Sequence, residues 1–508
     1  MRSVLAIHRW LGVVLCVAFL LWFPSGIGMM YWDFPGITPA ARLEHGSRLD
    51  AAAIRVSPAE AYATLGDDDP SPHVRLITHD GRPAYRFGEP DGESLVYADT
   101  GEPGGDVSKE QMLRMASAWA RQPPGDARVE AIDGIDQWTV QVDVQALRPL
   151  WKYSWPDGQQ VYVSQAEGEI VQYTTTASRM GAYAGAIPHW LYFTPLRKHG
   201  PAWARVVIWS SALGTVAAIL GLVIGAWMYA PSKRYRNAGV PTSIPYRGQK
   251  RLHMLCGLIF GLGAATWAFS GMLSMEPFPW MSGGPSGGRP PARQGIVRAL
   301  RGRAPLAACA AKDPRAVLAQ MPDADVRELA FASVAGEPMY VATLAGGATR
   351  LVPIAGEPRE DVDRQRMLDA VAKAAGPDRI AETSVLRQYD AYYLDRRRAR
   401  PLPVIRVQLA DADHSRYYID PKTARLVGAY SSRDWVHRWL YHGLHSLDFP
   451  WLYNHRPLWD IVVITFMVGV TALGVTSLVL AWRVLRRTLA RWPAAHQRRR
   501  TASTDDLA

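Results

Sequence analysis

Four stretches of this sequence are long and apolar enough to cross a lipid bilayer, and they constrain its fold more than any other feature. A spanning helix needs about 20 consecutive, mostly apolar residues, because the hydrocarbon core of a bilayer is about 30 Å thick. The stretches occupy residues 4–28, 203–229, 252–275 and 458–482. The sequence therefore predicts a membrane α-helical bundle of four spans in a lipid bilayer. Two long polar segments separate the spans and are expected to form two α+β domains.

The basic residues indicate which parts of the chain face the cytoplasm. The loop 230–251 contains several Lys and Arg residues and no Asp or Glu, and the tail 483–508 is also strongly basic. By the positive-inside rule, this loop, the tail and the N-terminus are predicted to be cytoplasmic. The polar segments 29–202 and 276–457 are then periplasmic if the membrane is a bacterial inner membrane. Because the net charge of +11 is explained by topology, we expect no nucleic-acid partner.

The first and third spans repeat one pattern of residues. His8 is followed by Gly four residues later, by Trp fourteen residues later and by a Ser-Gly pair seventeen and eighteen residues later. His253 is followed by the same residues at the same spacings. Self-similarity at a fixed period is the signature of an internal repeat, so this pattern indicates a duplicated chain.

A second pattern repeats in the amphipathic segments 186–202 and 435–457, which lead into the second and fourth spans. Each contains His, Leu, Phe, Leu, His, Pro and Trp at identical spacings, starting at His189 and at His445. Both patterns are unlikely to match by chance, so they indicate an internal duplication of the chain. The four repeated tryptophans are expected at the membrane interfaces, where this residue is enriched.

The polar segments repeat more loosely. Each begins with a candidate helix, at 57–65 and 315–318, and continues with alternating strand patterns that end in a hairpin pattern, at 161–171 and 417–427. We interpret each segment as a small α+β domain or as two such modules in tandem. The Gly- and Pro-rich run 282–295 is predicted to be a flexible connector.

The repeated histidines are candidate ligands of haem iron. Two neutral imidazoles can bind iron from opposite sides of a porphyrin, and glycines on the same helix face let the flat macrocycle approach the backbone. We predict two b-type haems, one near each membrane surface, and leave open which histidines share an iron. The candidate ligands are His8, His253, His189 and His445, the less favoured ligands are His199, His455 and His442, and the candidate haem-packing residues are Gly12, Gly257, Gly26 and Gly271.

Simpler roles compete with haem binding. His8 and His253 lie close enough to helix ends to meet lipid headgroups, and glycines on a helix face often serve close helix packing. The unrepeated histidines at positions 73, 79, 414 and 437 are expected at the surface. The sequence contains no nucleotide-binding or hydrolase motif, so electrons would have to come from quinol or a partner protein. No catalytic residue is assigned.

The duplicated motifs resemble a known family. The His-x-x-x-Gly and Ser-Gly pattern of the odd spans, the stretch RWLYHGLHSLDFPWLYNHRPLWD and the hairpins VYVSQAEGEIV and YYIDPKTARLV are similar to those of the PepSY-associated transmembrane proteins. These are iron-regulated inner-membrane proteins, and some resemble ferric-siderophore reductases. The resemblance implies periplasmic PepSY-like domains and, in the reductase-like members, two b-type haems. His8, His253, His189 and His445 occupy the matching positions.

The leading hypothesis is therefore a dihaem b-type reductase of the inner membrane. It would pass electrons outward to reduce ferric iron in the periplasm, bound to a siderophore or to another ferric chelate. Two alternatives remain open from the sequence. One is a non-enzymatic PepSY-type envelope binding or regulatory membrane protein, and the other is a transporter of iron or siderophore.

Overall fold

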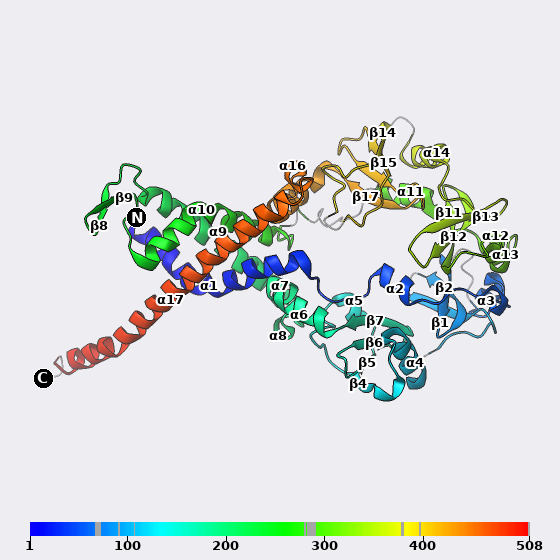
Figure 1. Cartoon of the computed structure of the whole chain (residues 1–508), viewed down its shortest axis with the longest axis horizontal. Helices are drawn as coiled ribbons and strands as arrows, with labels where there is room; N and C mark the ends of the chain where they lie inside the picture. Colours follow the sequence, from blue (N-terminus) through cyan, green and yellow to red (C-terminus); the bar gives the residue numbers. More distant parts are fainter. Residues whose placement is uncertain are drawn as a thin grey trace. The chain divides into compact units, whose positions relative to one another are not determined.

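The computed structural model describes residues 1–66, 73–89, 92–105, 107–278, 281, 291–376, 380–395 and 398–505. The chain divides into two compact units (Figure 1). Unit 1 comprises Met1–Phe34, Ala177–Ser282 and Trp435–Ala508, and unit 2 comprises Pro35–Thr176 and Gly283–Asp434. Unit 1 therefore contains the predicted spans, and unit 2 contains most of both polar segments.

Unit 1 is built on four helices that are long and apolar enough to cross a membrane. They are α1 (Arg2–Tyr31), α9 (Gly200–Met228), α10 (Gly248–Leu273) and α17 (Leu458–Asp505), of which Leu458–Ala490 is the apolar part. Many large apolar side chains remain exposed on them, among them Val14, Trp209 and Ile259. An apolar exterior is expected where a helix faces lipid, and the prediction of a helical membrane bundle is confirmed.

The packing of these helices follows the duplication. Helix α1 packs against α9 and α17, and α10 packs against the same two helices. Helices α1 and α10, which are equivalent in the two halves, therefore lie diagonally opposite each other across the bundle. The loop between α9 and α10 forms a small hairpin of β8 (Tyr235–Asn237) and β9 (Val240–Thr242).

The segments that lead into α9 and α17 repeat each other at their C-terminal ends. The first contains α6 (Thr176–Ala184), α7 (Ala186–Trp190) and α8 (Thr194–Arg197), and the second contains the π-helix η5 (Val436–Gly443), α15 (Leu444–Ser446) and α16 (Pro450–Tyr453). Leu191 and Leu447 both follow a short helix with a φ of 52°. The indoles of Trp203 and Trp459 both donate to a carbonyl thirteen residues earlier, at 2.8 and 3.0 Å. The repeat therefore extends to backbone detail.

Both polar segments contribute to one antiparallel sheet of unit 2. The first provides β1 (His73–His79), β2 (Arg82–Glu89) and β3 (Gly92–Tyr97), and the second provides β10 (Arg301–Gly302), β11 (Val326–Val334), β12 (Glu337–Leu344) and β13 (Thr349–Pro353). The strand order is β13-β12-β11-β1-β2-β3, with β10 beside β11. The sequence predicts that each segment forms an α+β domain or two modules of its own, whereas the first strands of the two segments share one sheet.

The pairing of β1 with β11 has a physical reason. Val74 lies opposite Phe331 and Leu76 lies opposite Leu329, and all four side chains are buried in one apolar core. Pairing the two strands also removes two exposed sheet edges. Helices α3 (Pro58–Ala63) and α13 (Pro314–Ala319) contribute to this core, each started by a polar cap residue. Both helices were predicted from the sequence.

Each segment also forms a second module with its own four-stranded antiparallel sheet. In the first segment, α4 (Lys109–Ala120) accompanies β4 (Arg128–Ile132), β5 (Leu150–Ser154), β6 (Gln160–Ser164) and β7 (Glu169–Thr174). In the second, α14 (Arg364–Ala375) accompanies β14 (Ile380–Leu386), β15 (Val404–Leu409), β16 (Arg416–Ile419) and β17 (Leu426–Tyr430). The two predicted hairpins are β6–β7 and β16–β17, so that prediction is confirmed.

The remaining described elements of unit 2 are short. They are α2 (Pro39–His45), η1 (Ala51–Ala53), η2 (Pro124–Asp126), α5 (Val142–Ala146), α11 (Pro291–Leu300), α12 (Leu306–Cys309) and η4 (Ser432–Asp434). Of the predicted connector 282–295, residues 282–290 lie outside the described residues. Residues 291–295 begin α11, so the prediction of a connector is wrong there, because proline is well tolerated in the first turn of a helix.

His79 was expected at the surface but is buried in unit 2, with only 5% of it exposed. It is the last residue of β1, on the face opposite to that of Val74 and Leu76, and a Cβ atom on Gly168 would lie 2.9 Å from its ring. Burial is the main cause that lowers the pKa of His79 to about 4, and the guanidinium of Arg86 contributes to this shift. The histidine is therefore neutral in the folded protein at pH 7.

Acid should destabilise unit 2 through His79. Between pH 6.5 and 4 the unfolded chain takes up a proton that the folded chain does not, so the free energy of unfolding falls as the pH falls. At pH 5 the loss is about 2 kcal/mol relative to pH 7.5. Thermal unfolding at both pH values should show a smaller acid shift for His79→Gln than for the wild type. The exposed His414 gives the control His414→Gln, and an equal acid shift in His79→Gln would contradict this assignment.

Candidate functional site

His8 on α1 and His253 on α10 face each other across the bundle, and we call them the span pair. Their ring centroids are 6.3 Å apart and their planes are inclined by 46°. Each imidazole is held by the even-numbered span of its own half. Nδ1 of His8 lies 2.9 Å from the carbonyl oxygen of Ala217 on α9, and Nδ1 of His253 lies 3.1 Å from the hydroxyl of Thr476 on α17.

The acceptors define the tautomer of the span pair. A carbonyl oxygen can only accept, so Nδ1 of His8 carries the proton. The hydroxyl of Thr476 already donates to the carbonyl oxygen of Leu473 at 2.8 Å, so it accepts from Nδ1 of His253. In both residues Nε2 is then the basic nitrogen, and it makes no hydrogen bond within the described part of the chain.

His189 on α7 and His445 on α15 form a second pair, which we call the lead-in pair. Their ring centroids are 5.9 Å apart and their planes are inclined by 66°. Nδ1 of His189 lies 3.0 Å from the carbonyl oxygen of Trp22, and Nδ1 of His445 lies 3.0 Å from the hydroxyl of Ser270, which also lies 3.3 Å from the carbonyl oxygen of Trp267. By the same reasoning Nδ1 is protonated in both rings and Nε2 is the basic nitrogen.

The repeated Ser-Gly motif positions the lead-in pair. The hydroxyl of Ser25 lies 3.3 Å from Nδ1 of His189, as that of Ser270 lies beside His445. A Cβ atom on Gly26 would lie 3.6 Å from the His189 ring, and one on Gly271 would lie 3.7 Å from the His445 ring. These two glycines, predicted to pack on haem, therefore border the ligand imidazoles themselves.

The other two predicted haem-packing glycines lie beside open space. A Cβ atom on Gly12 would meet no atom within 4 Å, and one on Gly257 would meet only a methyl group of Leu473, at 3.9 Å. Both lie one helical turn from a histidine of the span pair, since four residues separate them in sequence. No neighbouring side chain therefore packs tightly on either glycine.

Ser25→Ala and Ser270→Ala should each weaken metal binding by the lead-in pair. Residues that hydrogen-bond a metal-bound imidazole fix its orientation, and removing such a partner typically lowers metal affinity by about 10- to 100-fold. Haem titration of the purified variants should show weaker binding at one site and unchanged binding at the other. Wild-type affinity at both sites in both variants would contradict the role of these hydroxyls.

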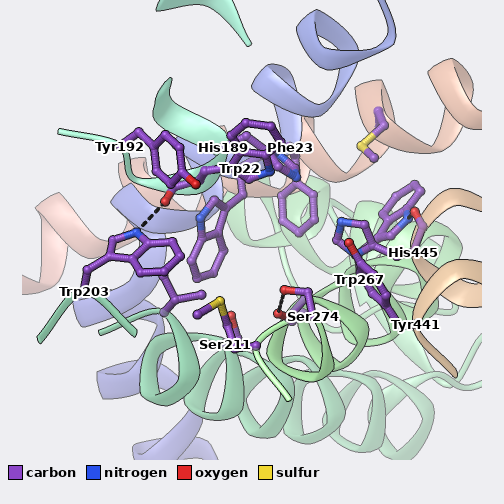
Figure 2. Close-up of a pocket in the computed structure, with 16 residues that line it drawn as sticks. Trp22, Phe23, His189, Tyr192, Trp203, Ser211, Trp267, Ser274, Tyr441 and His445 are labelled. Atoms are coloured by element: carbon purple, nitrogen blue, oxygen red, sulfur yellow. Dashed lines mark hydrogen bonds between the residues drawn. The ribbon is translucent and has the colours of Figure 1, made fainter. Parts of the chain in front are cut away.

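A cavity of about 230 Å³ adjoins the lead-in pair (Figure 2). Its lining is mainly aromatic, with a few polar side chains. Besides the two histidines, it includes Trp22, Phe23, Trp190, Tyr192, Trp203, Trp267, Tyr441 and Met467. Such a lining suits a flat apolar group.

The spacing within both pairs matches two imidazoles bound to opposite sides of one metal ion. A metal–imidazole bond is about 2.0 Å long and the ring centre lies about 1.1 Å beyond the nitrogen, so two opposed rings have centroids about 6 Å apart. The observed separations are 6.3 and 5.9 Å. The basic nitrogens of both pairs and the aromatic cavity beside the lead-in pair agree with this arrangement, so the residue types present fit bis-imidazole haem.

The structure separates the predicted ligands into two groups. The four favoured histidines form two pairs, each with one member from each half. His199 and His455 are both exposed, and Nδ1 of His455 lies 2.6 Å from the carbonyl oxygen of Trp451. His442 packs against His437 and Tyr441 on its own segment.

A layer of aromatic rings connects the two halves within the bundle, and sequence reasoning missed it. Phe23 and Trp267 are 6.2 Å apart, and Phe466 lies 6.5 Å from Trp267 and 5.8 Å from Phe260. The indole of Trp267 donates to the carbonyl oxygen of His445 at 2.8 Å. Trp267 and Trp459 were expected at the membrane interface, but both are buried because their indoles bind carbonyls of the second lead-in segment.

A scan of the sequence against models of protein families finds no match, and a search of curated proteins finds no similar chain. The features of this chain that bear on its function are therefore the two histidine pairs, the aromatic cavity and the layer of rings between the halves of the bundle.

Proposed function

We propose that this protein is a dihaem b-type membrane reductase, with one haem held by the span pair and one by the lead-in pair. The observation that carries the proposal is the spacing of the two pairs, in which each imidazole comes from a different half of the chain. A haem iron held by two imidazoles takes up and releases single electrons without an open coordination position.

The side chains around the histidines support this role. The Nδ1 hydrogen bonds fix the imidazole planes and increase the basicity of Nε2. All four imidazoles are partly buried among the helices. The rings of Phe23, Trp267 and Phe466 lie in contact with one another in the bundle. Electrons that pass between the span pair and the lead-in pair would therefore not have to cross aliphatic side chains alone.

The basic loop and tail support an orientation with the span pair near the cytoplasm and the lead-in pair near the periplasm of a bacterial inner membrane. Quinol or a partner protein would donate electrons on the inner side. The acceptor would be a ferric chelate, such as a ferric siderophore. Hard oxygen donors hold Fe(III) more firmly than Fe(II), so transfer of one electron weakens the complex and releases the metal. The resemblance to PepSY-associated proteins supports the same assignment.

Mixing the pre-reduced protein with a ferric trihydroxamate, in the presence of a chromogenic chelator specific for Fe(II), tests this function. We expect reoxidation of the haem bands at the same rate as ferrous iron appears, and loss of both signals when the span and lead-in pairs are disrupted together. Stable reduced bands and no ferrous iron over minutes would reject the reductase, even if haem is present.

A further inference from the structure

The two lead-in segments differ sharply just before the lead-in pair. The second half has His437, Tyr441 and His442 at positions where the first half has Gly181, Gly185 and Ala186. The backbone differs as well, because Val436–Gly443 is a π-helix. Extended π-helices are rare and are frequently found at functional sites. The three larger side chains are therefore specific to the second half and are not part of the internal repeat.

The π-helix brings His437 and His442 together. In an α-helix, residues five apart point in directions about 140° apart, so their side chains do not meet. A π-helix closes its hydrogen bonds between residues five apart, which places such residues above one another on one face. The two imidazole centroids are 4.7 Å apart, with their planes inclined by 83°.

This spacing differs from that of the haem-ligand pairs and fits another kind of site. Two imidazoles on adjacent positions of one metal ion have centroids about 4.5 to 5 Å apart, given metal–nitrogen bonds of about 2.0 Å. Imidazole suits divalent iron, nickel and zinc, whereas the oxygen donors of chelators favour Fe(III). Within the described ranges no cluster of three or more His, Cys, Asp or Glu side chains could hold a metal, so water would complete this coordination shell.

Tyr441 places the histidine pair one ring away from the lead-in pair. Its ring centroid lies 4.6 Å from that of His442, 5.2 Å from that of His437 and 5.5 Å from that of His445. A metal ion at His437 and His442 would thus lie close to the lead-in pair.

We propose that His437 and His442 form a binding site for a first-row divalent cation, and that its cargo is ferrous iron. The identity of the cargo rests on the proposed reductase function, whereas the metal site itself does not. One electron converts the ferric chelate to the ferrous form, the bonds from iron to the oxygen donors break, and Fe(II) then binds two imidazole nitrogens and water. The site would retain the reduced ion at the end of the bundle where it is produced.

Equilibrium dialysis of the purified full-length protein against Zn(II) and, under anaerobic reducing conditions, Fe(II) tests the site. We expect one bound ion per chain that is lost, or weakened at least tenfold, in His437→Gln and in His442→Ala. The second substitution copies Ala186 of the first half, so the fold tolerates that residue at this place in the repeat. The exposed His199 provides the matched control His199→Ala, which should bind as the wild type does.

The outcomes of the two proposals can be told apart. Dialysis needs no electron donor. If the wild-type protein is colourless and both substitutions abolish Zn(II) binding, the metal site is supported and the reductase function is contradicted. If the protein contains two haems but binds no divalent ion, or if both variants bind the ion as well as the wild type does, the metal-site proposal is contradicted and the reductase proposal stands. Unchanged elution and thermal unfolding of the variants will show that they are folded.

Discussion

Replacing either histidine of the span pair with alanine should remove the same haem. His8→Ala and His253→Ala should each lose about half of the bound haem, and the double variant should lose no more than either single variant. Combining His8→Ala with His189→Ala should remove both haems. The physical reason is that, in the proposed arrangement, each pair binds one iron from both sides, so that either member alone leaves only one strong ligand.

Haem per chain, measured by the pyridine haemochrome method, checks this set of variants. His199→Ala should retain both haems, because that residue is exposed and lies outside both pairs. Complete loss of haem from His8→Ala combined with His253→Ala would show that these residues serve different irons. The pairing described here would then be wrong, although haem binding itself would stand.

Adding one methyl group at Gly28 should destabilise the bundle and release the haem of the lead-in pair. A Cβ atom there would lie 2.5 Å from the carbonyl oxygen of Ala184 and 2.9 Å from Cα of Gly185. Both neighbours are backbone atoms, so no rotation of a side chain can relieve the clash. Helix α1 must instead separate from α7, which carries His189. We expect Gly28→Ala to lower the free energy of unfolding by about 1 to 3 kcal/mol.

Thermal unfolding and haem content of Gly28→Ala test this contact together. The midpoint should fall and the haem assigned to the lead-in pair should be lost first, while that of the span pair is retained. Gly200→Ala is the control, since its Cβ atom would approach only a guanidinium nitrogen of Arg197, at 3.8 Å. A wild-type midpoint with two haems in Gly28→Ala would contradict the close backbone contact.

The sequence was sufficient to identify the four histidines but not their partners. Identical spacing shows that His8 is equivalent to His253, yet it does not show that the two rings face each other. Only the diagonal packing of α1 and α10 does so. Gly12 and Gly26 share one face of their helix, but their separation of fourteen residues spans about 21 Å, so the two glycines belong to different ends of the bundle.

Other features were missed because they depend on tertiary structure or on rare local geometry. Nothing in the alternation of β1 indicates that β11, more than 200 residues later, is its neighbour. His437 was expected at the surface because the first half has no matching histidine, and only the π-helix brings it close to His442. Phe23 and Phe466 have no equivalent aromatic residue in the other half of the chain. The internal repeat therefore does not reveal the aromatic layer.

The reduced-minus-oxidised absorption spectrum of the purified protein tests the central claim most directly. We predict Soret and α-bands of b-type haem with an intensity of two haems per chain. A colourless, folded protein from haem-supplied cells, with no reducible bands, would contradict the claim. The histidine pairs would then be polar contacts between helices, and a non-enzymatic membrane anchor for the β-sheet domains would be the better account.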